Sequence, residues 1–123
     1  MTVRTLALAM GAEAATLVVA SALHFAAATG GSRPFRPDDA AIAEAVIAVV
    51  LVAGALAVAR GRRGAGTGAV SFAILGFLVG LNFTIRGGSA GDLAYHAAML
   101  PLLVLTLLAL LGRFPRSRSS IGV

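Results

Sequence analysis

The sequence predicts an all-α integral membrane protein, a four-helix bundle with up-down topology that forms a single domain over residues 1–123. The first observation is compositional. Hydrophobic residues make up 59% of the chain and charged residues 12%, whereas soluble domains have about 45–50% and about 25%. A soluble domain this small exposes much of its surface, and this chain has too few polar residues to cover one. The same composition excludes an intrinsically disordered chain.

The second observation is that the apolar residues form four runs of about 17–23 residues, the length at which a helix crosses the hydrocarbon of a bilayer. None of the runs contains Arg, and none alternates as a membrane β-strand does. We therefore expect membrane-spanning helices over residues 6–28, 40–59, 69–85 and 93–111, followed by a basic flexible tail over 112–123.

Local signals predict where these helices begin and end. Pro37, followed by two Asp residues, predicts the start of the second helix. Ser89 and Asp92 fit a capping box that opens the fourth helix. Residues 60–66, rich in Arg and Gly, predict a flexible basic loop. Pro101 predicts a kink within the fourth helix, because proline removes a backbone hydrogen bond.

The distribution of Arg predicts the orientation, because cytoplasmic loops carry an excess of basic residues. Seven Arg lie on one side of the predicted membrane and three on the other. We therefore expect both termini in the cytoplasm, at the inner membrane of a bacterium. A cleaved signal peptide is the alternative for the first run, but the run is long for one and an acidic residue interrupts it. The net charge of +5 then reflects topology and not nucleic-acid binding.

The predicted topology converts position along the chain into depth, at about 1.5 Å per residue. His24, Glu44, Asn82 and His96, one from each predicted helix, then lie roughly 7–11 Å from the bilayer midplane on its outer side. Glu13 shares the helix face of His24 but lies roughly 16 Å deeper, near the bilayer centre. Ionisable groups inside a membrane are costly and mark functional sites. The sequence therefore predicts an outer polar pocket with an acidic residue below it.

Several residues near this pocket have two interpretations. Asp92 either caps the fourth helix or binds a ligand. Arg86 either anchors a helix end or contributes to the pocket, and Tyr95 is either an interfacial aromatic or part of the site. Asn82 can instead hold neighbouring helices together through hydrogen bonds. The GxxxG element of Gly76 and Gly80 allows close helix approach, within the bundle or in a homodimer.

The residue types in the layer allow more than one chemistry. Imidazole and carboxylate groups suit a metal ion, for which His24, Glu44 and His96 are the candidate ligands, and two His at one depth suit haem b. A His or Glu can also act as acid or base towards a quinone or lipid-like ligand. The chain has no compact HxxxH or ExxH ligand motif. It also has no cysteine, which excludes disulfides, iron–sulfur clusters and thiolate chemistry.

Two resemblances add to these expectations. Ala43-Glu44-Ala45 at the head of the second run, with the basic turn Arg60-Gly61-Arg62-Arg63 at its end, resembles the DoxX-like group of small four-helix bacterial membrane proteins. That resemblance covers nearly the whole chain and implies a four-helix fold, in a group where some relatives are associated with quinone-linked redox work.

Glu13 in Ala12-Glu13-Ala14-Ala15-Thr16 resembles the small multidrug resistance family, in which a first-helix Glu exchanges protons and cationic drugs in a dimer. That family relies on intramembrane Trp and Tyr residues, whereas this chain has no Trp and only one Tyr.

We therefore expect a small membrane protein that binds a metal, haem, quinone or lipid-like ligand in its outer pocket, for redox or acid–base chemistry. The alternatives are a proton-coupled transporter that uses Glu13 as a dimer, and an accessory subunit of a membrane complex. The expected surroundings are the lipid bilayer, with a small hydrophobic ligand and no nucleic acid.

Overall fold

The computed structural model describes residues 1–28 and 37–112, and this part of the chain consists of four α-helices and their connections. The helices are α1 (Val3–Ala28), α2 (Pro37–Ala59), α3 (Arg63–Gly87) and α4 (Ala90–Leu110). All four are long and apolar enough to cross a membrane. The prediction of an all-α protein with four candidate membrane spans is confirmed. Insertion into a membrane, and its direction, stay predictions.

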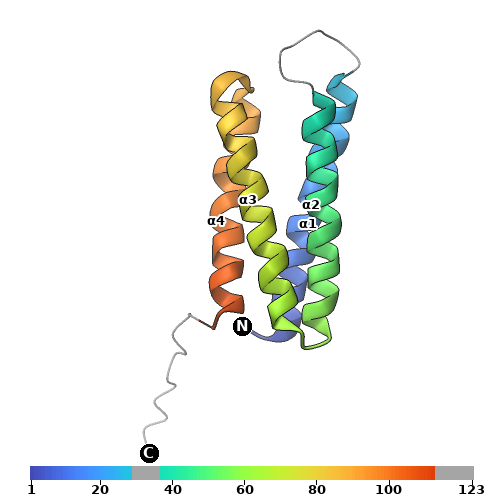
Figure 1. Ribbon diagram of the computed structural model, residues 1–123, viewed down its shortest axis with the longest axis vertical. Coiled ribbons are helices and arrows are strands. Elements are labelled where there is room, and N and C mark those ends of the chain that lie inside the picture. The colour runs from blue at the N-terminus through green and yellow to red at the C-terminus, as the bar shows by residue number, and fades with distance from the viewer. Residues whose placement is uncertain (29–36, 113–123) are drawn as a thin grey trace, which may run out of the picture.

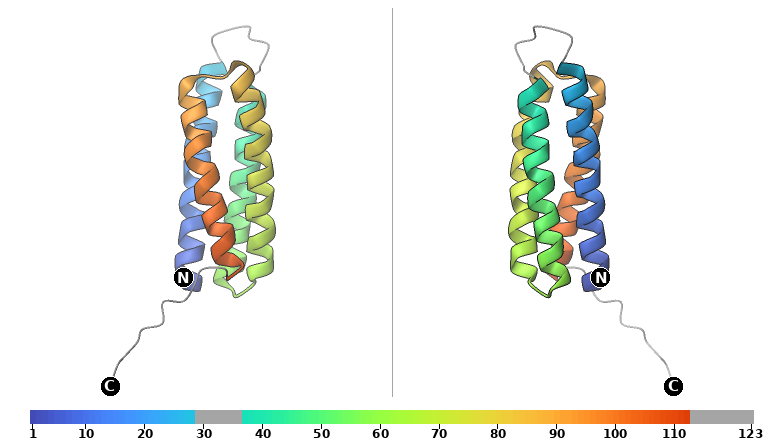
Figure 2. Two further views of the ribbon diagram at one scale, coloured as in Figure 1. Left: turned by 90° about the vertical axis from the view of Figure 1, so that its left-hand side faces the viewer. Right: turned by 90° about the vertical axis from the view of Figure 1, so that its right-hand side faces the viewer.

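The four helices run alternately up and down around a common core (Figures 1 and 2). Each helix packs against the next, and α4 closes the bundle against α1 through the least extensive of these four interfaces. The N-terminus, the α2–α3 connection and the end of α4 lie together at what we call the Arg60 end. The α3–α4 connection lies at the opposite end, beside the end of α1 and the start of α2, and we call this the Ser89 end.

Helix α3 begins six residues earlier than the sequence suggested, at Arg63 and not at residue 69. The connection is therefore a tight turn, in which Gly61 adopts a positive φ of 82°. Gly64 and Gly66, which were interpreted as loop residues, belong to the helix. A Cβ on Gly66 would collide with Val58 of α2, so the missing side chain permits this packing.

The surface and the core of the bundle are both largely apolar. Buried residues of the core include Leu6, Met10, Leu17, Leu51 and Leu103, all at 0% exposure. Large apolar side chains also cover the outside of every helix. Examples are Leu8 on α1, Val49 on α2, Leu75 on α3 and Leu102 on α4. Such an outer surface fits hydrocarbon and not water, because soluble monomers rarely expose large continuous apolar areas.

Helix α4 continues without a break through Pro101, from Ala90 to Leu110. Gly76 and Gly80 both face neighbouring helices of the same chain. A Cβ on Gly76 would lie 2.5 Å from the Cδ1 of Ile47, and one on Gly80 would lie 2.6 Å from the Nε2 of His96. The GxxxG element thus serves close approach inside the bundle, and a homodimer through it stays a prediction.

Candidate functional site

The start of α4 positions one of the site's carboxylates. The Ser89 hydroxyl accepts a hydrogen bond from the Asp92 backbone N–H at 3.1 Å. In return, Asp92 Oδ2 accepts from the backbone N–H of Ser89 at 3.1 Å and from its hydroxyl at 2.8 Å. The capping box predicted from the sequence is confirmed. It fixes the Asp92 side chain through Oδ2 and leaves Oδ1 for another partner.

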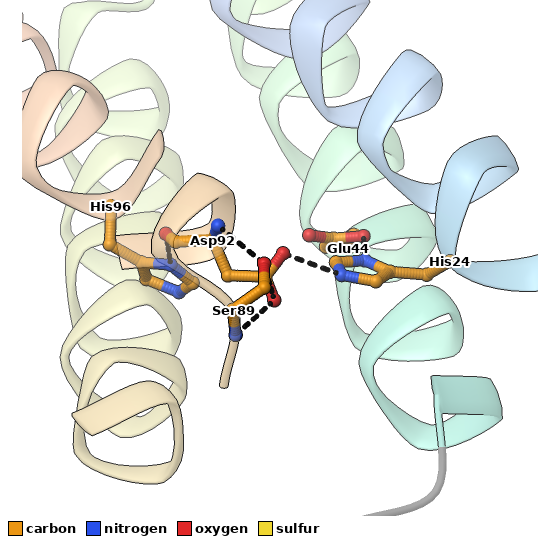
Figure 3. Close-up of polar contacts among 5 residues, drawn as sticks. All are labelled: His24, Glu44, Ser89, Asp92 and His96. Carbon is orange, nitrogen blue, oxygen red and sulfur yellow. Dashed lines mark hydrogen bonds and ion pairs between the residues drawn. The ribbon is translucent and has the colours of Figure 1, made fainter. Parts of the chain in front are cut away.

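That partner is His24, which lies between two carboxylates from two other helices (Figure 3). His24 Nδ1 of α1 is 2.7 Å from Glu44 Oε2 of α2, and its Nε2 is 3.2 Å from Asp92 Oδ1 of α4. We call these three side chains the His24 triad. It joins three helices at the Ser89 end, and each ring nitrogen of His24 faces a different carboxylate.

The geometry of the triad determines how many protons it holds. A neutral imidazole has one N–H and one acceptor nitrogen, and an ionised carboxylate only accepts. Hydrogen bonds at both ring nitrogens therefore require two protons among the three groups, either both on the imidazole or one on a carboxyl. In both cases the triad carries a net charge of −1. The triad therefore holds two protons and keeps at least one ionised carboxylate, which can accept a third.

The triad is enclosed on one side and open on the other. The Glu44 side chain is only 10% exposed, whereas those of His24 and Asp92 are 21% and 34% exposed. Glu44 is therefore the inner member and Asp92 the member nearest to solvent. The Asp92 side of the triad is therefore its most accessible part.

His96 lies beside the triad and is attached to it through the backbone. Its Nδ1 donates to the Asp92 carbonyl at 2.8 Å, since a carbonyl oxygen only accepts. The ring packs edge-on against Phe77 with centroids 5.2 Å apart, in the space that Gly80 provides. His96 is therefore a buried member of the neighbourhood that holds Asp92 in place, and it does not bond to His24 or Glu44.

The structure does not bring Asn82 and Arg86 into this cluster. Both residues are exposed on α3. The hydroxyl of Tyr95, in contrast, is buried and accepts or donates no hydrogen bond within the described part of the chain. The Tyr95 side chain is half-buried, and its ring lies against Phe77 with ring centroids 5.6 Å apart.

Glu13 forms a second polar site, deeper in the bundle. The residue is 6% exposed, and its Oε1 accepts a hydrogen bond of 2.6 Å from the Thr106 hydroxyl of α4. Its Oε2 is buried and has no hydrogen-bond partner among the described residues. One turn further along α1, the Thr16 hydroxyl donates to the Glu13 carbonyl at 2.7 Å and lies 3.5 Å from Met99 Sδ. Among the described residues, one carboxyl oxygen of Glu13 is therefore hydrogen-bonded and the other is not.

Thr106 was missed by the sequence reasoning, although the register of α1 and α4 identifies it. The two helices are antiparallel. A step of eleven residues back along α1, from His24 to Glu13, therefore matches a step of eleven residues forward along α4, from Asp92 to residue 103. Thr106 lies one turn beyond that position. The missing information was the single contact between His24 and Asp92, which sets this register.

The hydrogen bonds of the site bear on whether it could hold a metal ion or haem. Within residues 1–28 and 37–112, no group of three or more His, Asp and Glu side chains is placed to hold a metal ion. Both ring nitrogens of His24 and the Nδ1 of His96 already make hydrogen bonds. Ligation of a metal or haem by His24 would require one of its two hydrogen bonds to break, whereas ligation by His96 Nε2 would leave the Nδ1 bond intact.

Comparisons with known proteins found no match for this chain among protein-family models, curated proteins or solved structures. The resemblances to the DoxX-like group and to the small multidrug resistance family therefore stay predictions. The interpretation of the site depends on its own geometry.

Proposed function

We propose that the protein is a small multi-pass protein of a bacterial inner membrane, in which the His24 triad exchanges protons with a ligand that arrives from the bilayer, a quinone or a lipid-like molecule. The observation that carries this proposal is the imidazole of His24 between the carboxylates of Glu44 and Asp92. An imidazole with a positioned carboxylate is a common general acid–base arrangement. Here the second carboxylate supplies a further proton-binding group.

The surroundings of the triad support a ligand from the bilayer. The outside of the bundle is covered by large apolar side chains, so a hydrophobic molecule dissolved in lipid has direct access to the helices. The Asp92 and His24 side chains are the accessible members of the triad. A polar head group that reaches the Ser89 end from lipid therefore meets groups that hold two protons and one negative charge.

Tyr95 allows a direct test, because it is the only Tyr in a chain without Trp, and it lies one turn from Asp92. We would titrate decylubiquinone into protein in lipid nanodiscs and follow Tyr95 fluorescence. A bound quinone quenches it with a saturable curve, whereas quinone in the lipid alone quenches it in proportion to concentration. A pH-indicator dye measures the protons that binding takes up or releases.

The expected result is saturable quenching with a change in bound protons, both lost in His24→Gln. The matched control is Asn82→Ala, which removes an exposed polar group at the same depth and should leave both signals unchanged. Quenching that is only linear in the wild type, or saturable quenching that survives unchanged in His24→Gln, would overturn the proposal.

A second candidate function is proton-coupled transport through Glu13. The specific observation in its favour is the buried Oε2 of Glu13 without a partner among the described residues, because a transport site needs a carboxyl that is free to bind a cation or a proton. The test is ethidium uptake driven by a pH gradient in proteoliposomes. Uptake should be lost in Glu13→Gln and retained in the control Asp39→Asn, which alters an exposed carboxyl. Uptake that persists without Glu13 rules this function out.

A further inference from the structure

We propose that a groove between α2 and α3 holds one acyl chain of an anionic phospholipid, whose phosphate group lies at the basic turn of Arg60, Arg62 and Arg63. This turn joins α2 to α3 at the Arg60 end, opposite to the His24 triad. The inference therefore does not depend on the proposed function. Two observations carry it, an open apolar groove and a cluster of Arg beside it.

The first observation is the groove itself, which we call the α2–α3 groove. It has a volume of about 400 Å³ and an apolar lining. Gly54 of α2 and Ala69 of α3 form its floor, because both line the groove and both are buried. A Cβ on Gly54 would lie 2.5 Å from the Cβ of Ala69. The small residues thus let the two helices touch and leave a depression on the outside of the bundle.

Gly68 keeps the middle of this groove open. The residue is exposed, and a Cβ at this position would have no other atom within 4 Å. Phe72 lines the groove one turn further along α3 and is 45% exposed. The protein therefore offers an apolar space at its surface that its own side chains do not fill.

The length and position of the groove fit one chain in one leaflet. On α3 the groove runs from Ala65 to Phe72, which is roughly 10 Å of helix. The hydrocarbon of one leaflet is about 15 Å thick, half of the core of a bilayer. Ala65 follows Arg63 by two residues, so the groove begins next to the basic turn. An acyl chain whose head group lies at the turn can follow the groove for most of the leaflet.

The second observation is the charge of the turn. Gly61, with its positive φ of 82°, makes the turn tight, and Arg60, Arg62 and Arg63 are all exposed around it. The ion pairs within the described part of the chain are both formed by His24, at the opposite end. The three guanidinium groups are therefore available to a phosphate. Basic clusters beside membrane helices attract the anionic lipids of the cytoplasmic leaflet, which is where we expect this end.

The role of Arg in membrane topology would account for the basic turn by itself, but it gives no reason for a groove beside the turn. The two explanations differ in what they expect from a change in the groove that leaves every Arg in place. Topology alone predicts no effect on lipid binding. A bound phospholipid predicts a loss.

Native mass spectrometry of the full chain, released from micelles, counts bound phospholipids one by one. We would titrate the protein with phosphatidylglycerol and with phosphatidylcholine that have the same acyl chains. The first phosphatidylglycerol should bind at least about tenfold more tightly than the first phosphatidylcholine, because each basic residue adds attraction for an anionic lipid. Excess glycerol 3-phosphate, which has the phosphate but no chain, should not displace it.

Gly68→Leu fills the groove and keeps all three Arg. It should weaken binding of the first phosphatidylglycerol at least about fivefold, because the acyl chain loses its contacts with the groove. The matched control is Gly11→Leu, the same change on α1 at a position where a Cβ also has no atom within 4 Å, and it should bind as the wild type does. Arg62→Gln combined with Arg63→Gln should remove most of the preference for phosphatidylglycerol, whereas Arg86→Gln, at the Ser89 end, should retain it.

A second measurement covers the case in which Gly68→Leu does not fold. The wild type is irradiated with phosphatidylglycerol that carries a diazirine in its acyl chain, and the crosslinked residues are mapped by mass spectrometry. Crosslinks should concentrate on Ala53, Ala65 and Phe72, which line the groove, and not on Leu8 of α1, which is 74% exposed.

Five results would each overturn the site. They are equal affinity for the two lipids, displacement by glycerol 3-phosphate, binding that Gly68→Leu leaves unchanged, a lipid preference that survives the double Arg variant, and crosslinks spread evenly over the bundle. None of these variants alters the His24 triad, so quinone binding there and lipid binding here fail separately.

Discussion

Replacement of Thr106 by Val tests how far the bundle depends on its buried hydrogen bond to Glu13. Valine has the shape of threonine but no hydroxyl, so the change removes the 2.6 Å bond to Glu13 Oε1 and little else. Since Oε2 already has no partner among the described residues, the carboxyl then has none at either oxygen. Thr106→Val thus isolates the contribution of one hydrogen bond in the interior of the bundle to the free energy of unfolding.

The expected magnitude follows from two limits. Interhelical hydrogen bonds in membrane proteins average about 0.6 kcal/mol and reach about 1.7 kcal/mol, whereas a buried polar group left unpaired costs about 1–3 kcal/mol. Because Glu13 loses its only side-chain bond, we expect Thr106→Val to reduce the free energy of unfolding by about 1–2 kcal/mol. A loss of about 1.4 kcal/mol is a tenfold change in the unfolding equilibrium.

The assay is a double-mutant cycle with Thr106→Val, Glu13→Leu and the double variant, unfolded reversibly by SDS in mixed micelles and followed by far-UV circular dichroism. In the Glu13→Leu background, Thr106→Val should have almost no effect, and Glu13→Leu alone should be neutral or stabilising because it removes a buried carboxyl. Thr67→Val is the control, since the Thr67 hydroxyl bonds only to the backbone of its own helix at 3.1 Å. A coupling energy below about 0.5 kcal/mol would refute the reasoning.

Three further predictions concern the Ser89 end and the topology. Gly80→Ala should displace the His96 ring, with a net loss of about 1 kcal/mol after the gain in helix propensity, whereas Gly11→Ala, which has open space, should be neutral or stabilising in the same SDS assay. Ser89→Ala should destabilise the start of α4 by about 1 kcal/mol, and amide hydrogen exchange of its first turn should accelerate about fivefold; unchanged exchange would show that Asp92 is held by other contacts. Reporter fusions at the two termini should both be active in the cytoplasm, and activity of either on the outer side would overturn the orientation.

The number and type of the helices were predictable from the sequence because the solvent dictates them. A run of about 20 apolar residues in a bilayer must satisfy its backbone internally, and a helix does so. The start of α3 was not predictable in the same way. Gly61, Gly64 and Gly66 indicate a loop by composition, but Gly64 and Gly66 lie in α3, and the missing side chain of Gly66 allows α3 to pack closely against Val58 of α2. Tertiary packing here overrides local propensity.

The sequence predicted the height of each polar residue along its helix, but not the direction in which its side chain points. His24 and Glu44 share a layer and do meet at 2.7 Å. Asn82 shares the layer but lies on the exposed face of α3, because depth gives the height of a residue and not the rotation of its helix. Asp92 was interpreted as either a cap or a ligand. It is both a cap and a partner of His24, since its two oxygens have different partners.

The polar contacts of the bundle are concentrated at its weakest interface. In lipid, apolar surfaces gain nothing from leaving the solvent, so helices associate through close packing and hydrogen bonds. Helices α2 and α3 pack closely at small residues, as between Gly54 and Ala69. Helices α1 and α4 have the least extensive contact, yet His24–Asp92 and Glu13–Thr106 both join them. Titratable groups thus supply two contacts where packing is least extensive, so a change in their protonation alters the contact between α1 and α4 as well as the His24–Glu44 contact between α1 and α2.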